Sequence, residues 1–476
     1  MTMSARKETI RRHIDAEAAK RAQWLKRAAF LHQEDLLYLK FLIPEGARVL
    51  ELGCGTGDLL AALRPSFGVG VDFSDATIAQ ARKAHPGLTF LVADIEDPTF
   101  IQSLPGPFDV IVVIDTLGAL DDCQAMFEHL HALCTRETRL VIGHFSHLWY
   151  PALKFAEAIG VKMPQPPQNV LAPADVRSLA ALADFDVVKS EMRVLLPLRL
   201  LGLGRFINRF LAPMPLVRQL CLRHYTVCRS LRRPASGLQS ATVVIPARNE
   251  RGNIEATVKR IPRFTEALEV IFVEGHSKDG TWEEIERVVA AYPRYDIKAI
   301  RQQGMGKADA VFAGFELARG DVLIILDADL TVPPEQLPKF WDALRSGKGE
   351  FANGSRLVYP MEQQAMRFLN LIANKVFSLL FTWLLSQRFT DTLCGTKALA
   401  RSDYARLKAG RDYFGNFDPF GDFDLIFGAS KLGLKAVEIP VRYGSRTYGE
   451  TQISRFRHGL MLLRMVWFAF IRIKAM

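Results

Sequence analysis

The chain has 476 residues, of which 49% are hydrophobic and 24% are charged, a composition that excludes wholesale disorder and a coiled coil. Its net charge of +10 is concentrated in two stretches without acidic residues: residues 193–233, with nine arginines, and residues 451–476, with five basic residues. The remainder is close to neutral, which excludes a uniformly basic nucleic-acid binder. Six cysteines without a CxxC pair argue against a zinc ribbon or a disulfide scaffold, so we expect reduced thiols.

We expect neither a leader nor a membrane-spanning segment in this sequence. Charged residues recur every few positions in the first thirty residues, which is not typical of a signal peptide. The longest charge-free apolar run in the C-terminal half, Val376 to Gln387, has 12 residues, whereas a spanning helix needs about 20. We therefore expect a cytoplasmic protein.

The pattern of apolar residues predicts two α/β domains. Residues 1–45 are rich in Ala, Lys, Arg and Glu and predict helix; from Arg48 to about Val188, short β-branched runs alternate with helical stretches. Such alternation predicts βαβ units and a mostly parallel sheet. A second alternation begins at Ala241, after a linker-like stretch at 232–237. We expect a first domain over residues 1–192, a basic apolar segment and linker over 193–239, and a second domain over 240–476 that ends in an amphipathic helix.

A glycine-rich turn follows the first predicted strand, with the spacing GxGxG at Gly53, Gly55 and Gly57 and with Glu51 before it. Glycines permit positive φ and let a ligand approach the backbone, and the free amides of a helix start attract polar groups. Asp72 ends the next predicted strand, 19 residues after Gly53, which suits a ribose diol. A turn without a ligand and a nicotinamide cofactor are the alternatives.

Asp94 follows the third predicted strand and Asp115 the fourth. Together with the glycine turn and Asp72, these motifs resemble the class I S-adenosylmethionine-dependent methyltransferases over roughly residues 45–190. The resemblance implies a Rossmann-like fold and S-adenosylmethionine as cofactor. It assigns cofactor contacts to seven residues: Glu51, Gly53, Gly55, Gly57, Asp72, Asp94 and Asp115.

The methyl acceptor is not encoded in a recognisable motif. The fourth strand is not followed by the Asn/Asp-Pro-Pro-Tyr/Phe motif, which argues against methylation of exocyclic base amines. An oxygen acceptor could use a histidine base, and the two candidates are His144 and His147. We take His144 as the catalytic candidate, with a structural or surface histidine as the alternative.

Two carboxylates end a hydrophobic strand of the second domain, at Asp327 and Asp329. Side chains at i and i+2 of a strand face the same way, and adjacent carboxylates are unfavourable unless a cation neutralises them. Mg²⁺ and Mn²⁺ combine a few carboxylates with phosphate oxygens and water. We therefore predict that Asp327 and Asp329 bind such an ion with a diphosphate, and a solvated loop is the alternative.

The sequence around this pair resembles the family 2 glycosyltransferases of GT-A-type fold over roughly residues 240–450, most closely the dolichyl-phosphate mannose/glucose synthase branch. The resemblance implies a nucleotide-sugar donor. It assigns donor contacts to Pro246, Arg248, Glu250, Glu274, Asp279, Lys307, Asp327 and Arg356. Glu274-Gly275-His276-Ser277 departs from the family's Asp-Asp-Gly-Ser pattern, so the base of the nucleotide stays open.

The acceptor side is predicted from charge. Asp424 is the first choice for an acceptor-side catalytic carboxylate and Asp422 the second, Asp329 is assigned to catalysis on the donor side, and Arg442 and Arg446 are placed to hold an acceptor phosphate. For the two arginines, a plain surface cluster is the alternative.

Two segments predict peripheral contact with the inner face of a membrane. Arg367–Trp383 and Gly459–Ile473 combine apolar and basic residues, with core helices as the alternative. A polyprenyl-phosphate or glycan acceptor would be held there, and no nucleic acid is expected.

We therefore expect a bifunctional enzyme that combines metal-dependent inverting glycosyl transfer, to a lipid phosphate or cell-envelope glycan, with S-adenosylmethionine-dependent methyl transfer. One alternative keeps the first domain as a non-catalytic regulator that binds the cofactor. The other is a nucleic-acid methyltransferase with an appended sugar domain.

Overall fold

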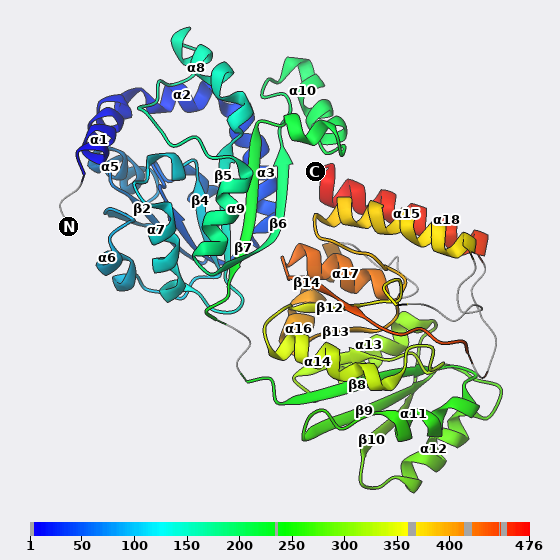
Figure 1. Cartoon of the computed structure of the whole chain (residues 1–476). Helices are drawn as coiled ribbons and strands as arrows, with labels where there is room; N and C mark the ends of the chain where they lie inside the picture. The colour runs from blue at the N-terminus through cyan, green and yellow to red at the C-terminus, as the bar shows by residue number, and fades with distance from the viewer. Residues whose placement is uncertain (1–3, 234–236, 360–367, 414–420, 447, 449–454) are drawn as a thin grey trace. The chain divides into compact units, whose positions relative to one another are not determined.

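The computed structural model describes residues 4–233, 237–359, 368–413, 421–446, 448 and 455–476 (Figure 1). The chain forms two compact units: unit 1 is Met1–Pro234 with Lys474–Met476, and unit 2 is Ala235–Ile473. Each unit has its own seven-stranded sheet. The expected fold class, two α/β domains, is therefore confirmed.

Unit 1 begins with helices, as the composition of its first 45 residues predicts. They are α1 (Ala5–Glu17), the 3₁₀ turn η1 (Ala18–Lys20), α2 (Arg21–Arg27) and α3 (Ala29–Leu42). Ser4 caps α1, since its hydroxyl accepts a hydrogen bond from the Lys7 N–H, 3.2 Å away.

The sheet of unit 1 has the order β3-β2-β1-β4-β5-β7-β6, with β1 to β5 parallel and β7 antiparallel to both of its neighbours. The strand order reverses between β1 and β4, so the carboxyl ends of these strands flank a crevice where ligands of such sheets bind. The strands are β1 (Arg48–Leu52), β2 (Phe67–Asp72), β3 (Thr89–Val92), β4 (Val110–Ile114), β5 (Arg139–Phe145), β6 (Phe185–Arg193) and β7 (Arg223–Ser230). The helices between them are α4 (Asp58–Ala62), α5 (Asp75–Ala84), α6 (Pro98–Ser103), α7 (Cys123–Leu130), α8 (Tyr150–Ala158) and α9 (Pro173–Leu182).

The position of β7 differs from the domain boundaries drawn from the sequence, which left residues 193–239 outside the first domain. β7 lies between β5 and β6, and all eight of its residues are buried. Composition alone indicated a separate basic segment because the acidic partners of its arginines are distant in sequence. Arg223 pairs with Asp35, and Arg229 pairs with Asp186. The first sheet is therefore completed by residues from the basic segment.

Unit 2 has the strand order β10-β9-β8-β11-β13-β12-β14, and only the pairs that involve β13 are antiparallel among the described strands. Its strands are β8 (Ser240–Ala247), β9 (Ala267–Glu274), β10 (Asp296–Arg301), β11 (Val322–Ile325), β12 (Phe351–Ser355), β13 (Lys397–Ala400) and β14 (Ala436–Pro440). Its helices are α11 (Ile254–Arg260), α12 (Thr281–Ala291), α13 (Lys307–Leu317), α14 (Leu337–Arg345), α15 (Phe368–Leu385), α16 (Arg401–Ala409), α17 (Asp422–Lys431) and α18 (Arg455–Ala469).

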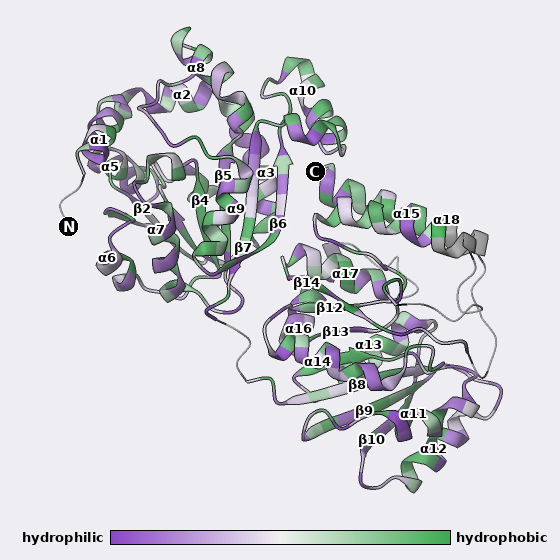
Figure 2. Ribbon diagram, viewed as in Figure 1, coloured by the Kyte–Doolittle hydropathy of each residue, from purple (hydrophilic) through white to green (hydrophobic). Residues whose placement is uncertain are grey.

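Hydrophobic residues follow the central strands of both sheets (Figure 2). These strands form the cores of the two units, and the loops that follow their carboxyl ends extend from these cores. In the part of the chain that the structure describes, no helix combines the length and the apolar character needed to cross a bilayer.

Candidate functional sites

The glycine turn of unit 1 connects β1 to α4 in a conformation that requires glycine. Gly53 has φ +77°, and a Cβ there would lie 2.2 Å from Oγ1 of Thr116. The Asp72 carboxylate accepts hydrogen bonds from the backbone N–H groups of Gly55 (2.9 Å) and Ser74 (3.0 Å), which fixes the turn to the end of β2. Glu51 accepts from the Leu60 N–H at 3.1 Å, and burial raises the pKa of Glu51 to about 8.

Basic side chains of the N-terminal helices reach the same edge of the sheet. Nζ of Lys7 lies 2.6 Å from the carboxylate of Asp94, one of the seven predicted cofactor contacts. A Cβ on Gly55 would lie 2.3 Å from Nη2 of Arg21, so this guanidinium stands directly against the turn. Sequence reasoning missed Lys7 and Arg21 because such contacts leave no local pattern; Lys7 and Asp94 are 87 residues apart.

A pocket opens beside the carboxyl ends of β4 and β5, next to the two predicted residues Asp115 and His144. Its polar lining also includes His147, Tyr150, Lys154, Glu157, Gln165, Gln168 and Asn169. Nδ1 of His144 lies 3.0 Å from the Phe145 carbonyl, while Nε2 is buried and has no hydrogen-bond partner among the described residues. Burial lowers the pKa of His144 below its ordinary value, so the neutral imidazole is favoured.

Asp115 is held at this pocket by a buried arginine. Nη1 of Arg223 lies 2.6 Å from Asp115, and its Nε lies 3.0 Å from Asp35 on α3. The Tyr225 hydroxyl donates to the same Asp35 oxygen, and the Arg223 guanidinium lies 4.5 Å from the centre of the Phe145 ring. Asp115 is thus part of a charged network that ties α3, β4 and β7 together.

In unit 2, the acidic pair lies in a turn and not on a strand. β11 ends at Ile325, so the alternation of strand side chains does not orient Asp327 and Asp329, and that step of the sequence argument was wrong. Each carboxylate has its own cation: Nζ of Lys307 lies 2.6 Å from Asp327, and Nη2 of Arg446 lies 2.6 Å from Asp329.

Lys307 is the first residue of α13, and it joins the acidic turn to α17. Its Nζ is 3.9 Å from Asp422, the first residue of α17, which also lies 3.1 Å from Nζ of Lys397. Although burial opposes the charge, Asp327 and Asp422 raise the pKa of Lys307. A Cβ on Gly395 would lie 2.1 Å from Asp327 Oδ2 and 2.4 Å from Lys307 Nζ, so this residue leaves space against the pair.

Arg446 lies with the donor-side carboxylates, whereas the sequence argument placed it on an acceptor phosphate. Its Nη1 is 3.3 Å from Glu250, so the guanidinium bridges Glu250 and Asp329. Burial raises the pKa of Glu250 to about 7. Arg442, its expected companion, has an exposed side chain.

The remaining predicted donor residues occupy the loops after β8 and β9. Glu274 ends β9 and accepts from the Ser277 N–H at 2.5 Å; Asp279 accepts from the N–H groups of Arg251 (3.2 Å) and Thr281 (3.1 Å). Pro246 is half-buried in β8 and Arg248 is exposed beyond its end. Because β8, β9 and β11 are parallel, these loops lie at one edge of the sheet with the acidic turn.

Two predicted residues have their charges neutralised outside this cluster. Arg356 forms a two-pronged pair with the buried Asp391, at 2.7 and 2.8 Å. Asp424 pairs with Arg411 at 2.9 Å, and it stands two residues after Asp422 on α17, on nearly the opposite face of the helix. The structure therefore brings Asp422, the second choice, to the acidic turn and leaves Asp424 outside it.

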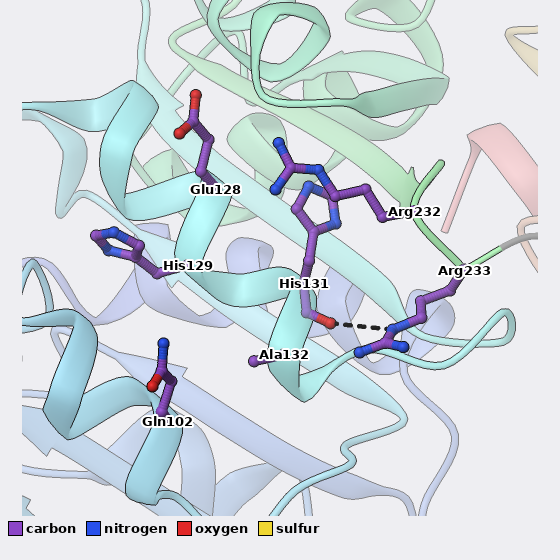
Figure 3. Close-up of a pocket in the computed structure, with 7 residues that line it drawn as sticks. All are labelled: Gln102, Glu128, His129, His131, Ala132, Arg232 and Arg233. Atoms are coloured by element: carbon purple, nitrogen blue, oxygen red, sulfur yellow. Dashed lines mark hydrogen bonds between the residues drawn. The ribbon is translucent and has the colours of Figure 1, made fainter.

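The described residues contain no group of three or more His, Cys, Asp or Glu side chains suited to a metal ion. A further hollow in unit 1, of about 510 Å³, is lined by Gln102, Glu128, His129, His131, Ala132, Arg232 and Arg233 (Figure 3). Both ring nitrogens of His131 are bonded, to Ser230 Oγ and to the Ala183 carbonyl, each at 2.6 Å. We assign no role to this hollow.

Comparison with known families identifies both halves of the chain. Residues 21–190 match the family described as methyltransferase domain, and residues 242–406 match glycosyl transferase family 2. The chain joins a methyltransferase domain to a family 2 glycosyltransferase domain. Both are transferase domains, as the motifs of the two halves predict.

The glycosyltransferase domain is similar to proteins whose names combine mannose with dolichol phosphate or polyprenol. The chain is 30% identical over 218 residues to dolichol-phosphate mannosyltransferase of Pyrococcus furiosus, a match that covers 44% of this chain and 58% of that protein. It is 28% identical over 222 residues to polyprenol monophosphomannose synthase of Mycolicibacterium smegmatis, covering 45% of this chain and 82% of that protein.

The methyltransferase domain is similar to a solved S-adenosylmethionine-dependent methyltransferase from Thermotoga maritima. The identity is 16% and the TM-score is 0.36, and the match covers 46% of this chain and 99% of that one.

Proposed function

We propose that the glycosyltransferase domain transfers a sugar from a nucleotide-sugar to a polyprenyl phosphate, with inversion and with the help of a divalent metal ion. The acidic turn after β11, faced by Lys307, Arg446 and the space at Gly395, carries this proposal. The names of the two relatives support a lipid-phosphate acceptor.

The side chains of the turn fit Mg²⁺ or Mn²⁺ bound together with a diphosphate. Such an ion needs only one or two protein carboxylates, because phosphate oxygens and water supply its other ligands. Asp327 and Asp329 would hold it, and when bound it neutralises charge on the departing diphosphate. Lys307 and Arg446 carry N–H donors that suit phosphate oxygens and compensate the carboxylates without a metal.

The acceptor side follows from the chemistry of a phosphate nucleophile. A lipid phosphate is already ionised, so a strong base contributes little. We assign Asp422 to the site, since it lies between Lys307 and Lys397, and we assign Asp424 a structural role beside Arg411.

We place the lipid end of the acceptor at the helices α15 and α18 (Figure 2). These helices contact each other, and the ring of Trp383 on α15 stacks on the ring of Phe470, the residue after α18, with ring centres 5.6 Å apart. Large apolar side chains on them are exposed: Ile372, Val376, Leu379, Leu460, Leu463 and Trp467. Part of each predicted membrane segment lies outside the described residues. In the first segment these are residue 367 and the side chains of 368–371, and in the second it is residue 459, of which only the helical backbone is described. Neither helix contains an acidic residue, which suits an anionic membrane surface.

The test is transfer of radiolabelled sugar from GDP-mannose or UDP-glucose to dolichyl or undecaprenyl phosphate, with Mg²⁺, Mn²⁺ or EDTA. We expect EDTA to abolish transfer and Asp327→Asn to slow it at least 100-fold. Asp342→Asn, which changes an exposed acid on α14, is the matched control. Transfer at the parental rate in EDTA would contradict metal dependence.

We further propose that the methyltransferase domain binds S-adenosylmethionine and methylates an oxygen. Its residues fit the cofactor: Asp72 has lone pairs left for a diol, Asp94 can accept from an amine, and Arg21 offers a cation to a carboxylate. The bound sulfonium supplies an activated methyl group, so the protein's main task is to position the acceptor.

His144 is the base in this proposal. With its Nδ1–H donated to the Phe145 carbonyl, the buried Nε2 has a lone pair without a partner among the described residues, and this lone pair would take the proton of an acceptor hydroxyl. The rate of methyl transfer should rise with pH through the lowered pKa of His144, below 6.5, and then level off.

The test pairs calorimetry of S-adenosylhomocysteine with methyl transfer to the glycolipid product of the other domain. His144→Gln should keep the binding and lose at least 100-fold in rate, whereas His129→Gln on α7 should change neither. Cofactor binding without transfer to any envelope extract would instead favour a regulatory domain.

A further inference from the structure

The connection between β6 and β7 is an apolar, basic insertion, which we call the β6–β7 insertion (residues 194–222). It contains four arginines and no acidic residue. It folds into short helical turns: η5 (Leu200–Gly202), α10 (Leu203–Phe206), η6 (Ile207–Leu211) and η7 (Val217–Leu220). None of the residues that we assign to cofactor binding or catalysis belongs to it.

Large hydrophobic side chains of the insertion point into solvent. The side chain of Leu201 is fully exposed, at 108%, and that of Leu216 is 84% exposed. Six more are exposed by about half: Leu198, Leu200, Leu203, Phe206, Leu211 and Leu220. Eight such side chains lie within 23 residues of the chain, a density of exposed large hydrophobic residues that is typical of an interaction surface.

The fold holds these side chains outward instead of collapsing them. Leu200 and Leu201 have φ of +36° and +53°, a conformation that is unfavourable for a bulky residue and persists only when the surroundings impose it. The Asn208 amide bonds both backbone groups of Leu196, each at 2.9 Å, and reaches Glu34 on α3 at 3.2 Å. The exposed tip is therefore fixed to the domain.

Cations stand among the exposed leucines. Arg199 and Arg205 are exposed, and Arg209 and Arg218 are half-buried. A partner that satisfies this surface must be apolar and negatively charged over the same area. The surface of an anionic lipid bilayer has that combination, with acyl chains just beneath its phosphates. Single-stranded nucleic acid would instead select aromatic platforms over leucines.

We propose that the β6–β7 insertion binds the surface of an anionic bilayer, with Leu201 and Leu216 entering the boundary between headgroups and acyl chains. This contact belongs to the methyltransferase domain and is independent of the proposed glycosyl transfer and of the helices α15 and α18. It would hold the methyl-acceptor pocket close to lipid-linked substrates.

The direct test labels one position of the full chain with an environment-sensitive fluorophore. The six native cysteines are buried, so a Leu201→Cys variant reacts selectively under native conditions. Vesicles of phosphatidylcholine with about one third phosphatidylglycerol should raise and blue-shift its fluorescence. The matched control, Leu182→Cys, places the label on an equally apolar position of α9, 62% exposed, and should not respond.

The second measurement is co-sedimentation with the same vesicles. The double variant Leu201→Ser with Leu216→Ser should bind at least tenfold more weakly and still bind S-adenosylhomocysteine, which shows that the domain is folded. Leu379→Ser with Trp467→Ser tests α15 and α18 separately. Sedimentation of the labelled chain without a response at position 201 would overturn the proposal, as would equal binding to pure phosphatidylcholine. A response that depends on protein concentration without vesicles would also overturn it, because it indicates contact between two copies.

Discussion

Gly395→Ala is the substitution that tests the sugar-transfer site most directly. A Cβ at this position would lie 2.1 Å from Oδ2 of Asp327 and 2.4 Å from Nζ of Lys307, whereas ordinary contacts begin at 3.4 Å. Both atoms must therefore move by about 1 Å or more. Both are the ends of flexible side chains, so the fold can adapt, and we expect little change in the free energy of unfolding.

The catalytic cost is expected to be much larger. A misplacement of about 1 Å at a reacting centre costs about 100-fold in rate. That factor corresponds to about 2.7 kcal/mol of lost transition-state stabilisation. The alanine variant should therefore fold normally and transfer sugar about 100-fold more slowly.

The assay is the initial rate of labelled-sugar transfer to a polyprenyl phosphate, alongside thermal unfolding. Gly410→Ala is the matched control, because it lies in the same domain, has φ −96° and would place its Cβ at ordinary distances of 3.7 and 3.8 Å from helix carbonyls. A folded Gly395→Ala enzyme that works within twofold of the parent would refute the placement of the diphosphate beside Asp327.

The other predictions concern buried charges. Asp422→Asn should slow sugar transfer at least 100-fold, whereas Asp424→Asn should chiefly lower the free energy of unfolding, by about 1–3 kcal/mol; rates and urea curves separate the two. Arg223→Met leaves two carboxylates without their cation and should destabilise unit 1 by about 3–5 kcal/mol in urea unfolding, and an unchanged curve would contradict the network. Burial lowers the pKa of His224 to about 4, so the folded state binds fewer protons than the unfolded state below pH 6.5. The contribution of His224 to stability should be constant above pH 6.5 and fall from there towards pH 4, and the difference in unfolding free energy between the parent and His224→Phe should follow this course.

Local patterns were sufficient to predict the fold class and the loops that form the two candidate sites. The GxGxG turn lies after β1, and Asp72 ends β2, because glycine spacing and strand length are local properties. The edge of the second sheet could be predicted in the same way, because parallel strands bring the loops after β8, β9 and β11 together.

Contacts between residues that are distant in sequence could not be predicted from local patterns. The choice between Asp422 and Asp424 depends on which face of α17 meets Lys307, and Lys307 is more than 100 residues away. The position of Arg446 beside Glu250 could not be predicted for the same reason, because the two residues are 196 positions apart. Arg21 gave no signal at all, since an arginine in a charged helix resembles any solvated one.

The ion pair between Asp35 and Arg223 can form only late in the synthesis of the first half of this protein. The two residues are 188 positions apart, and β7 enters the sheet between strands that are already present in the nascent chain. Until residue 230 has left the ribosome, the sheet has a gap beside β5 and an unneutralised carboxylate on α3. The sheet of the methyltransferase half is therefore complete only as translation of the glycosyltransferase half begins.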